Sequence, residues 1–133
     1  MLIRKAKKED LKELVKLDGE AHKEIKWWTP LKRSDFMKFL KGENLLFVAE
    51  INDVVVGYQS AKIEKRILIL EDLYVKKEFR NKNIATKLIK KAILESKRYN
   101  INQIRFNCPE KLRKFYEKLG FKVTSLVMKK RLK

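Results

Sequence analysis

Three apolar runs stand close together in the middle of the chain, and they limit the fold more than any other feature. They span residues 45–51, 54–63 and 67–75, with only short polar segments between them. The Asn52-Asp53 pair between the first two runs is typical of the tight turn of a β-hairpin. The third run is almost continuously apolar, as expected of a buried central strand. The sequence therefore predicts three successive strands, with the third near the centre of a sheet.

Helical periodicity flanks this central region on both sides. Residues 8–25 carry apolar side chains three and four positions apart, which predicts a first helix with a break at Gly19. Ser34 is a suitable N-cap for a short second helix, which Gly42 would end. A third helix is expected over residues 84–99, with lysines on its polar face.

The remaining segments complete an alternation of strands and helices. Residues 2–6 and 103–108 are predicted strands, and Pro109 and Gly120 bracket a fourth helix. Residues 121–132 are predicted to return as a bent strand. This order predicts an α/β (α+β) fold, a mixed and mostly antiparallel sheet with helices on both faces.

Composition limits the kinds of site that the chain can hold. No repeat, low-complexity tract or linker divides it, so residues 1–133 are expected to form a single domain. One cysteine, Cys108, and one histidine, His22, exclude a disulfide framework and a Cys/His zinc site. No run is long enough to span a membrane, and the first residues lack the apolar core of a signal peptide. We therefore expect a cytoplasmic protein with no metal and no membrane partner.

The charge is strongly positive: 34 Lys and Arg oppose 17 Asp and Glu, a formal net charge of +17. A lysine-rich solvated surface is the favoured interpretation. An anionic partner, such as nucleic acid or a phosphorylated cofactor, is the alternative. Neither aromatic–basic alternation nor a helix-turn-helix pattern is present, so nucleic acid is a disfavoured partner.

The connection from the third central strand to the third helix, V-K-K-E-F-R-N-K-N-I-A-T-K-L, is the most informative stretch for function. The first turn of such a helix has N–H groups without partners and the positive end of a helix dipole, so it can hold a phosphate. Such turns usually contain glycine, but Asn81 and Asn83 stand here instead. Asparagine adopts left-handed geometry more readily than other non-glycine residues. We expect a working phosphate-binding turn, to which Lys82 and Lys87 add charge; an ordinary surface turn is the alternative.

Two motifs resemble those of a known superfamily. E-D-L-Y-V-K-K-E-F-R-N-K-N-I-A-T-K-L resembles the cofactor motif of the GNAT superfamily of N-acetyltransferases, whose loop follows the pattern Gln/Arg-x-x-Gly-x-Gly/Ala. F-Y-E-K-L-G-F, residues 115–121, resembles the second motif, and the order of elements agrees over essentially the whole chain. The resemblance implies the GNAT fold, with two parallel strands that splay apart around acetyl-CoA. It is closest to polyamine- and amine-acetylating members.

The resemblance also implies which residues bind acetyl-CoA. The end of the central strand would pair its main chain with the pantetheine arm, through Leu73, Tyr74 and Val75. Arg80 occupies the Gln/Arg position of the motif. The pyrophosphate would lie against the N–H groups of the turn, which belong to Asn81, Lys82, Asn83, Ile84, Ala85 and Thr86.

Transfer by direct attack in a ternary complex, as the resemblance implies, needs a base. An alkyl ammonium ion has a pKa near 10.4 and is protonated at neutral pH, and a carboxylate can accept its proton. Glu71 and Asp72 stand towards the end of the central strand, and side-chain alternation implies that only one faces the acceptor. The resemblance favours Glu71. Asp72 and a water chain remain open, as does a structural role in which the carboxylate pairs with a surface lysine.

Tyr116 occupies the position of the acid that protonates the departing CoA thiolate in the family. It also lies on the apolar stripe of the fourth helix, and a tyrosine can serve the core and a cleft at once. Pro109 stands where many members have an asparagine, and Asn107 is the nearest substitute. Trp27 and Trp28 fall in the loop that shapes the acceptor pocket, where they would stack on a substrate or pack on the sheet.

These observations together predict an N-acetyltransferase that moves acetyl from acetyl-CoA to a primary amine of a small molecule or a protein. A homodimer is compatible with the sequence. A CoA-binding protein without catalysis is the main alternative, and a basic nucleic-acid-binding domain is a disfavoured one. The net charge of +17 opposes a polycationic acceptor unless the acceptor side is locally acidic, so the acceptor remains open.

Overall fold

The computed structural model describes residues 1–25 and 29–132, so Trp27 and Trp28 of the predicted acceptor loop lie outside the described residues. Five strands form one sheet in the order β1-β2-β3-β4-β5. They are β1 (Leu2–Lys5), β2 (Leu45–Ile51), β3 (Val54–Glu64), β4 (Ile67–Val75) and β5 (Gln103–Arg105). The first four pair antiparallel, and β5 pairs parallel with β4. The predicted mixed, mostly antiparallel sheet is confirmed.

The turn between β2 and β3 follows from its residues. Asn52 and Asp53 both have positive φ, 50° and 64°. A two-residue hairpin turn of this kind needs two left-handed residues, and Asn and Asp adopt that conformation at low cost. The predicted hairpin is therefore confirmed, with its register fixed by the turn.

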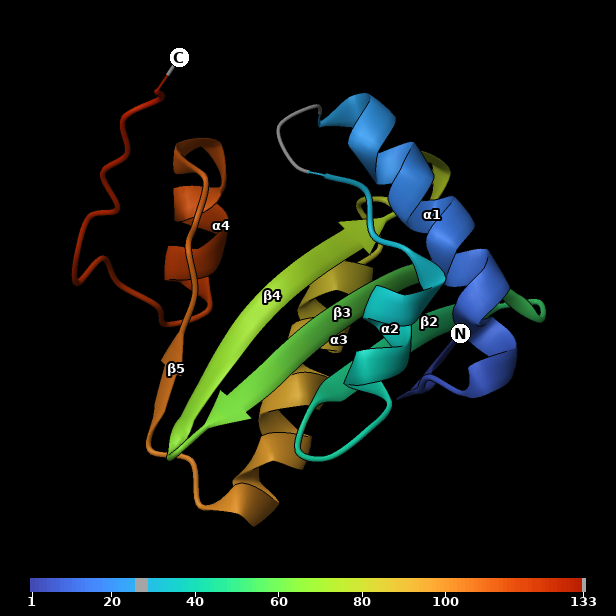
Figure 1. Ribbon diagram of the computed structural model, residues 1–133, viewed down its shortest axis with the longest axis horizontal. Coiled ribbons are helices and arrows are strands. Elements are labelled where there is room, and N and C mark those ends of the chain that lie inside the picture. The colour runs from blue at the N-terminus through green and yellow to red at the C-terminus, as the bar shows by residue number, and fades with distance from the viewer. Residues whose placement is uncertain (26–28, 133) are drawn as a thin grey trace.

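Helices cover both faces of the sheet (Figure 1). On one face lie α1 (Leu11–Glu24) and α2 (Arg33–Phe39), and on the other lies α3 (Ile84–Ser96). The short helix α4 (Arg113–Lys118) follows β5. Each face has its own core. The α1-side cluster consists of Leu11, Leu14, Leu17, Ala21, Phe36, Leu46, Val48, Val55, Tyr58 and Tyr74. The α3-side cluster consists of Leu45, Phe47, Ala49, Val56, Ala61, Ile63, Leu68, Leu70, Val75, Ile84, Leu88, Ile89, Ala92 and Tyr116.

Two helix boundaries differ from the prediction. The first helix continues through Gly19, whose missing Cβ has nothing within 4 Å, because the apolar stripe on either side still packs on the sheet. The second helix starts at Arg33 instead of after Ser34. Lys32 is the flanking residue, and its N–H donates to the carboxylate of Asp35 at 2.8 Å. The expected cap at Ser34 is therefore wrong.

The C-terminal part of the chain holds less strand than predicted. β5 ends at Arg105, and no strand forms within residues 121–132. A strand needs a neighbour for its backbone groups, but this segment runs past α4 on the side away from β4 (Figure 1). Five of its apolar side chains are exposed: Val123, Leu126, Val127, Met128 and Leu132.

The two parallel strands separate after a short contact. Only Ile67–Ile69 of β4 pairs with Gln103–Arg105 of β5, and the strands then diverge (Figure 1). The later part of β4, from Leu70 to Val75, pairs with β3 alone within the described chain. None of the helices that the model describes has the length and apolarity to cross a lipid bilayer.

Candidate active site

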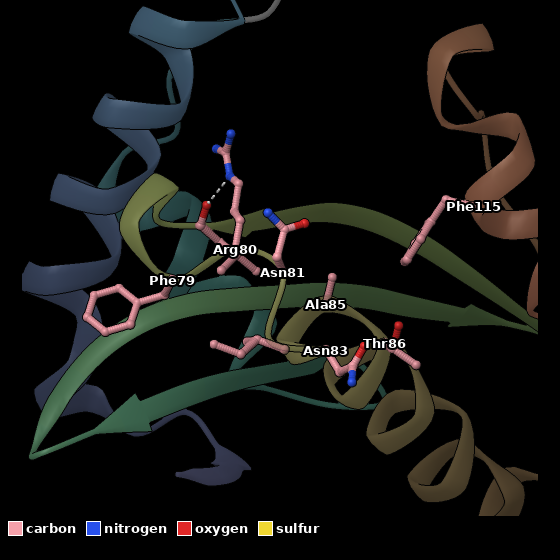
Figure 2. Close-up of a pocket in the computed structure, with 9 residues that line it drawn as sticks. Phe79, Arg80, Asn81, Asn83, Ala85, Thr86 and Phe115 are labelled. Atoms are coloured by element: carbon pink, nitrogen blue, oxygen red, sulfur yellow. Dashed lines mark hydrogen bonds between the residues drawn. The ribbon is translucent and has the colours of Figure 1, made fainter.

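A cavity of about 300 Å³ lies at the end of β4 beside the first turn of α3 (Figure 2). Its walls come from the turn that the sequence singled out, together with one residue of α4. The lining residues are Val75, Phe79, Arg80, Asn81, Asn83, Ile84, Ala85, Thr86 and Phe115. Seven of the predicted cofactor-binding residues thus gather around one cavity.

The turn holds both asparagines in the left-handed conformation. Asn81 has φ 64°, and Asn83, which flanks α3, has φ 62°. Within the described chain, none of the backbone N–H groups from Asn81 to Thr86 donates a hydrogen bond. Two left-handed residues next to a helix start turn successive N–H groups into one concave surface, which suits an anion. These features fit the phosphates of acetyl-CoA.

The side chain of Arg80 is directed elsewhere. Its two terminal nitrogens donate to the carboxylate of Glu24, each at 2.6 Å, and its Nε donates to the carbonyl oxygen of Val75 at 3.0 Å. The guanidinium also lies 5.4 Å from the centre of the Tyr74 ring. Hydrogen bonding to Arg80 lowers the pKa of Glu24. Arg80 therefore ties the end of β4 to α1, and its predicted contact with the cofactor stays a prediction.

Three predicted cofactor residues do not line the cavity. Leu73 packs against the α3-side cluster, and Tyr74 is buried in the α1-side cluster on the opposite face. The Nζ of Lys82 lies over the ring of Phe79, 5.5 Å from its centre. Their proposed contacts would be made by the main chain of β4 or by the rim of the turn.

A β-bulge in β4 changes the expected placement of its two carboxylates. Leu70 pairs with Ala61 and Leu73 with Gln59, so Glu71 and Asp72 together lie opposite Ser60. The extra residue breaks the alternation of side chains. The expected alternation, with Glu71 and Asp72 on opposite faces of the sheet, is therefore wrong.

Both carboxylates instead lie on the α1 side of the sheet. Glu71 pairs with Lys62 at 3.4 Å, and Lys62 points to the face opposite Ile63 of the α3-side cluster. Asp72 lies near Asp18 of α1, whose charge acts on it. The bulge is held by side chains: Asp72 N–H donates to Ser60 Oγ at 3.0 Å, and Gln59 Nε2 donates to the Asp72 carbonyl at 3.1 Å.

The two carboxylates differ in their surroundings. Burial raises the pKa of Asp72 to about 6. The negative charges of Asp18 and Glu71 also raise this pKa, and a hydrogen bond to Ser60 lowers it. Glu71 is a third exposed and shares Lys62 with Glu64. A proton acceptor for an amine is most effective with a pKa near the working pH, which Asp72 approaches.

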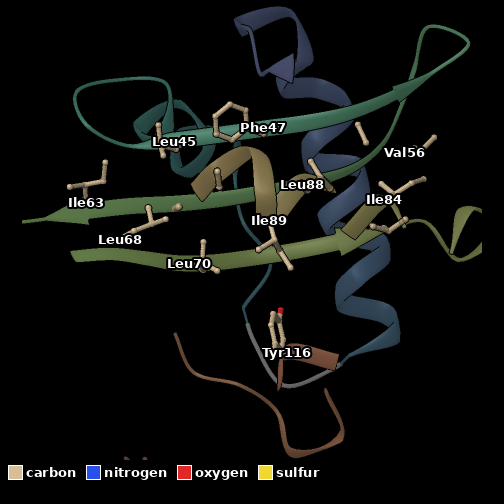
Figure 3. Packing of buried hydrophobic residues seen from close by; sticks show 14 residues of the cluster. Leu45, Phe47, Val56, Ile63, Leu68, Leu70, Ile84, Leu88, Ile89 and Tyr116 are labelled. Carbon is tan, nitrogen blue, oxygen red and sulfur yellow. The ribbon is translucent and has the colours of Figure 1, made fainter. Parts of the chain in front are cut away.

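Tyr116 belongs to the core and is not itself among the residues that line the cavity. It is 9% exposed, and its ring contacts those of Phe106, Phe115 and Phe121. Figure 3 shows its hydroxyl pointing towards the sheet. Burial raises the pKa of Tyr116 to about 12, so the phenol keeps its proton at neutral pH. Phe115, its neighbour on α4, reaches the cavity.

Sequence reasoning missed a buried polar pair under α1. Asp18 is fully buried, and its carboxylate accepts the Tyr58 hydroxyl and the Leu31 N–H, both at 2.7 Å. A signal was present, since Asp18 occupies a position on the apolar stripe of the first helix, four residues after Leu14. An acidic side chain buried at such a position needs hydrogen-bond donors from neighbouring elements.

The chain matches the family model described as acetyltransferase (GNAT) domain over residues 18–131. A comparison with curated protein sequences found no match.

Several solved structures share the fold at low sequence identity. Glucosamine-6-phosphate N-acetyltransferase from Arabidopsis thaliana is 21% identical with a TM-score of 0.81, and the match covers 99% of this chain and 98% of that one. A predicted acetyltransferase with acetyl-CoA from Clostridium acetobutylicum is 19% identical with a TM-score of 0.81, covering 98% and 95%. The aminoglycoside N-acetyltransferase AAC(6')-Iy in complex with CoA is 19% identical with a TM-score of 0.82, covering 99% of each chain.

Proposed function

Because the chain belongs to the GNAT acetyltransferase family, we propose that it transfers the acetyl group of acetyl-CoA to a primary amine by direct attack in a ternary complex. The observation that carries the proposal is the turn of Asn81 and Asn83, which lines a cavity at the end of β4 and whose N–H groups have no hydrogen-bond partner within the described part of the chain. This turn supplies what the pyrophosphate of the co-substrate requires, which is several converging donors at a helix N-terminus.

The surroundings of the turn support the same assignment. Lys82 and Lys87 add positive charge beside it. After Ile69, the edge of β4 that faces β5 has no strand partner within the described chain, which leaves main-chain groups available for the pantetheine arm. The phosphates would be held by the N–H groups from Asn81 to Thr86. Acetyl-CoA supplies an activated thioester, and the residues described here orient it and move protons.

The proposed reaction uses one proton acceptor and one proton donor. The amine nitrogen forms a bond to the acetyl carbon, and the carbon–sulfur bond breaks. The carboxylate pair of the bulge, Glu71 as the sequence predicts or Asp72, accepts the proton that the amine loses. The sulfur leaves as a thiolate and takes a proton from the hydroxyl of Tyr116.

The α1 side of β4 supports a cationic acceptor. Glu71, Asp72 and the buried Asp18 lie on this face, and Glu24 stands at the end of α1. Glu71 is paired with Lys62 and Glu24 with Arg80, so Asp18 and Asp72 supply the negative charge that offsets the net charge of +17 on this face. We propose an amine or polyamine as the acceptor class, in line with the motif resemblance.

An acceptor screen with acetyl-CoA, read as released thiol, tests the proposal most directly. Acetyl-CoA should also raise the melting temperature, by about 2.7 kcal/mol of stability at a hundredfold excess over its Kd. S-acetylpantetheine, which lacks the phosphates that the turn would hold, should give a smaller shift. Binding without transfer to any amine would favour the noncatalytic alternative, and no shift at millimolar acetyl-CoA would contradict the assignment of the turn.

Tyr116→Phe keeps the ring in its aromatic cluster and removes only the hydroxyl. Turnover should fall about 10²-fold or more, the usual range for loss of a general acid, while the melting temperature stays close to that of the parent. Tyr99→Phe is the matched control, because Tyr99 packs on the same cluster from the far end of α3. Equal turnover in both variants would return Tyr116 to a purely structural role.

A further inference from the structure

The buried carboxylate of Asp18 lies under the face of the sheet that carries the proposed proton acceptors. It is fully buried on α1, yet its bonded partners are both neutral: the hydroxyl of Tyr58 on β3 and the N–H of Leu31. Both of its oxygens therefore act as hydrogen-bond acceptors. No ion pair joins Asp18 to a lysine or arginine within residues 1–25 and 29–132.

Asp18 is bonded to Tyr58 of β3, and Asp72 is bonded to Ser60, two residues further along the same strand, so the charge of Asp18 can act on Asp72. Asp72 is flanked by the hydroxyl of Ser60 on β3 and by Glu71 on its own strand, with Tyr58 and Tyr74 also on this face. Lys62 pairs with Glu64 and Glu71. Asp72 thus lies near two carboxylates, and no salt bridge joins it to a lysine or arginine within residues 1–25 and 29–132. Like charges at short range disfavour ionisation of a carboxyl group.

Glu71 has the opposite surroundings. Its carboxylate is more exposed and forms an ion pair with the Lys62 ammonium at 3.4 Å. The bulge places both carboxylates on the same face of the sheet. They therefore differ in the groups that surround them and not in the face to which they point.

We propose that Asp18 is a positioning residue of the acetyl transfer proposed above: together with the burial of Asp72, the Asp18 charge favours Asp72 over Glu71 as the carboxylate that accepts the proton of the amine. The amine proton then passes to a carboxylate oxygen of Asp72 as the bond to the acetyl carbon forms, and it leaves to water after the product departs. This inference rests on the proposed function for its role in turnover, but the coupling of the two carboxylates exists in the free enzyme. The pKa of Asp72, about 6, supports the assignment.

The coupling can be measured without acetyl-CoA, by a carbon-13 NMR titration of the Asp72 carboxyl in the free protein. Asp18→Asn keeps the shape and removes the charge, so the midpoint for Asp72 should fall by about half a pH unit or more. Tyr58→Phe is the matched variant, since it removes a hydrogen bond to Asp18 and keeps the charge. It leaves that charge less neutralised, so the Asp72 midpoint should rise.

The two variants keep the inference testable if one is unstable. An equal fall of the midpoint in both would show that repacking, and not charge, links the sites, and would overturn the inference. If Asp18→Asn does not fold, Tyr58→Phe decides alone, and an unchanged or lower midpoint overturns it.

Turnover gives a second readout that a merely structural role would not move. In Asp18→Asn, the acid limb of kcat against pH should shift to lower pH, with an unchanged KM for acetyl-CoA because the turn at Asn83 is untouched. If the NMR midpoints shift as expected but the protein acetylates no amine, the coupling is supported and the proposed function is contradicted. Transfer with unshifted midpoints would overturn this inference alone.

Discussion

At Asn81 and Asn83 the backbone adopts a conformation that costs most L-residues about 1–2 kcal/mol. Asparagine adopts it at lower cost, and unlike glycine it does not add freedom to the unfolded chain. The turn therefore keeps the geometry of a glycine-rich loop while losing less entropy on folding.

Substitutions at Asn83 separate these two effects. Asn83→Val should lose about tenfold or more in affinity for acetyl-CoA, because a β-branched residue resists φ 62° and the N–H groups would no longer converge. Asn83→Gly should bind about as well and melt slightly lower. Binding is measured by calorimetry and melting by circular dichroism.

Asn100 provides the matched control. It also has positive φ, 57°, but it ends the turn after α3 and is not among the residues that line the cavity. Asn100→Val should lower the melting temperature and leave the affinity unchanged. If Asn83→Val binds as tightly as the parent, phosphate does not constrain that backbone.

Asp72 makes the stability of the protein depend on pH. Burial raises its folded-state pKa to about 6, above the ordinary value of 3.8, so the folded state holds the proton more tightly. Stability should therefore decrease as the pH rises from about 4 to about 6 and stay level above that. Asp72→Asn should remove this dependence and raise the free energy of unfolding at pH 8 by about 1–3 kcal/mol.

Urea unfolding at several pH values checks this expectation. Glu71→Gln is the control, because a partly exposed ion pair such as Glu71–Lys62 contributes little, and its effect should stay within about 1 kcal/mol. An Asp72→Asn variant that is less stable than the parent at pH 8 would show that the carboxylate is stabilised by contacts not described here.

At the scale of elements, the sequence predicted what depends on local pattern. The strands up to β4, the hairpin at Asn52-Asp53 and the helix starting at Ile84 follow from periodicity and turn chemistry. The bulge at Glu71 and Asp72 could not be predicted, because it depends on Gln59 and Ser60 of another strand. The same limit applies to residues 121–132, whose apolar pattern suits a strand but whose pairing depends on distant neighbours.

The candidate site shows the same division. The turn of Asn81 and Asn83 lies within a few residues of sequence, so its role could be inferred directly. The bonds of Arg80 to Glu24 and of Asp18 to Tyr58 join positions far apart in the chain, 56 and 40 residues respectively. Their existence was beyond a local pattern, although a carboxyl group on an apolar stripe indicated that some partner must exist.

Substitution by alanine should have opposite effects on stability at Gly57 of β3 and at Gly19 of α1. A Cβ at Gly57 would lie 2.9 Å from the carbonyl oxygen of Tyr74 and 3.2 Å from Val75 Cγ2. Gly57→Ala should therefore destabilise the protein by about 1–3 kcal/mol and weaken acetyl-CoA binding, because it pushes β3 away from β4 beside the cavity. Gly19→Ala meets nothing within 4 Å and should stabilise the helix by about 0.5–1 kcal/mol. Thermal unfolding measures both, and the same sign in both would contradict the packing argument.

At the scale of the whole molecule, the net charge of +17 acts together with an incomplete sheet edge. Within the described chain, β5 pairs on one side only, and the apolar side chains of Val123, Leu126, Val127, Met128 and Leu132 are exposed. An unpaired edge and an apolar segment are the usual sites where copies of a protein join. Repulsion between strongly positive molecules opposes such contacts.

These two features make self-association of the protein depend on the salt concentration. The window V-T-S-L-V-M, residues 123–128, holds six successive residues without charge or proline, between Lys122 and Lys129. Raising the salt from 0.1 M to 1 M shortens the screening length from about 10 Å to about 3 Å. The repulsion between molecules is then screened, and residues 123–128 can associate with other copies of the protein. Light scattering should therefore rise with salt in the parent and much less in Val127→Lys, and scattering that is flat in both would show that the segment is covered in solution. The protein should thus be easiest to concentrate in dilute buffer, where its own charge keeps the molecules dispersed.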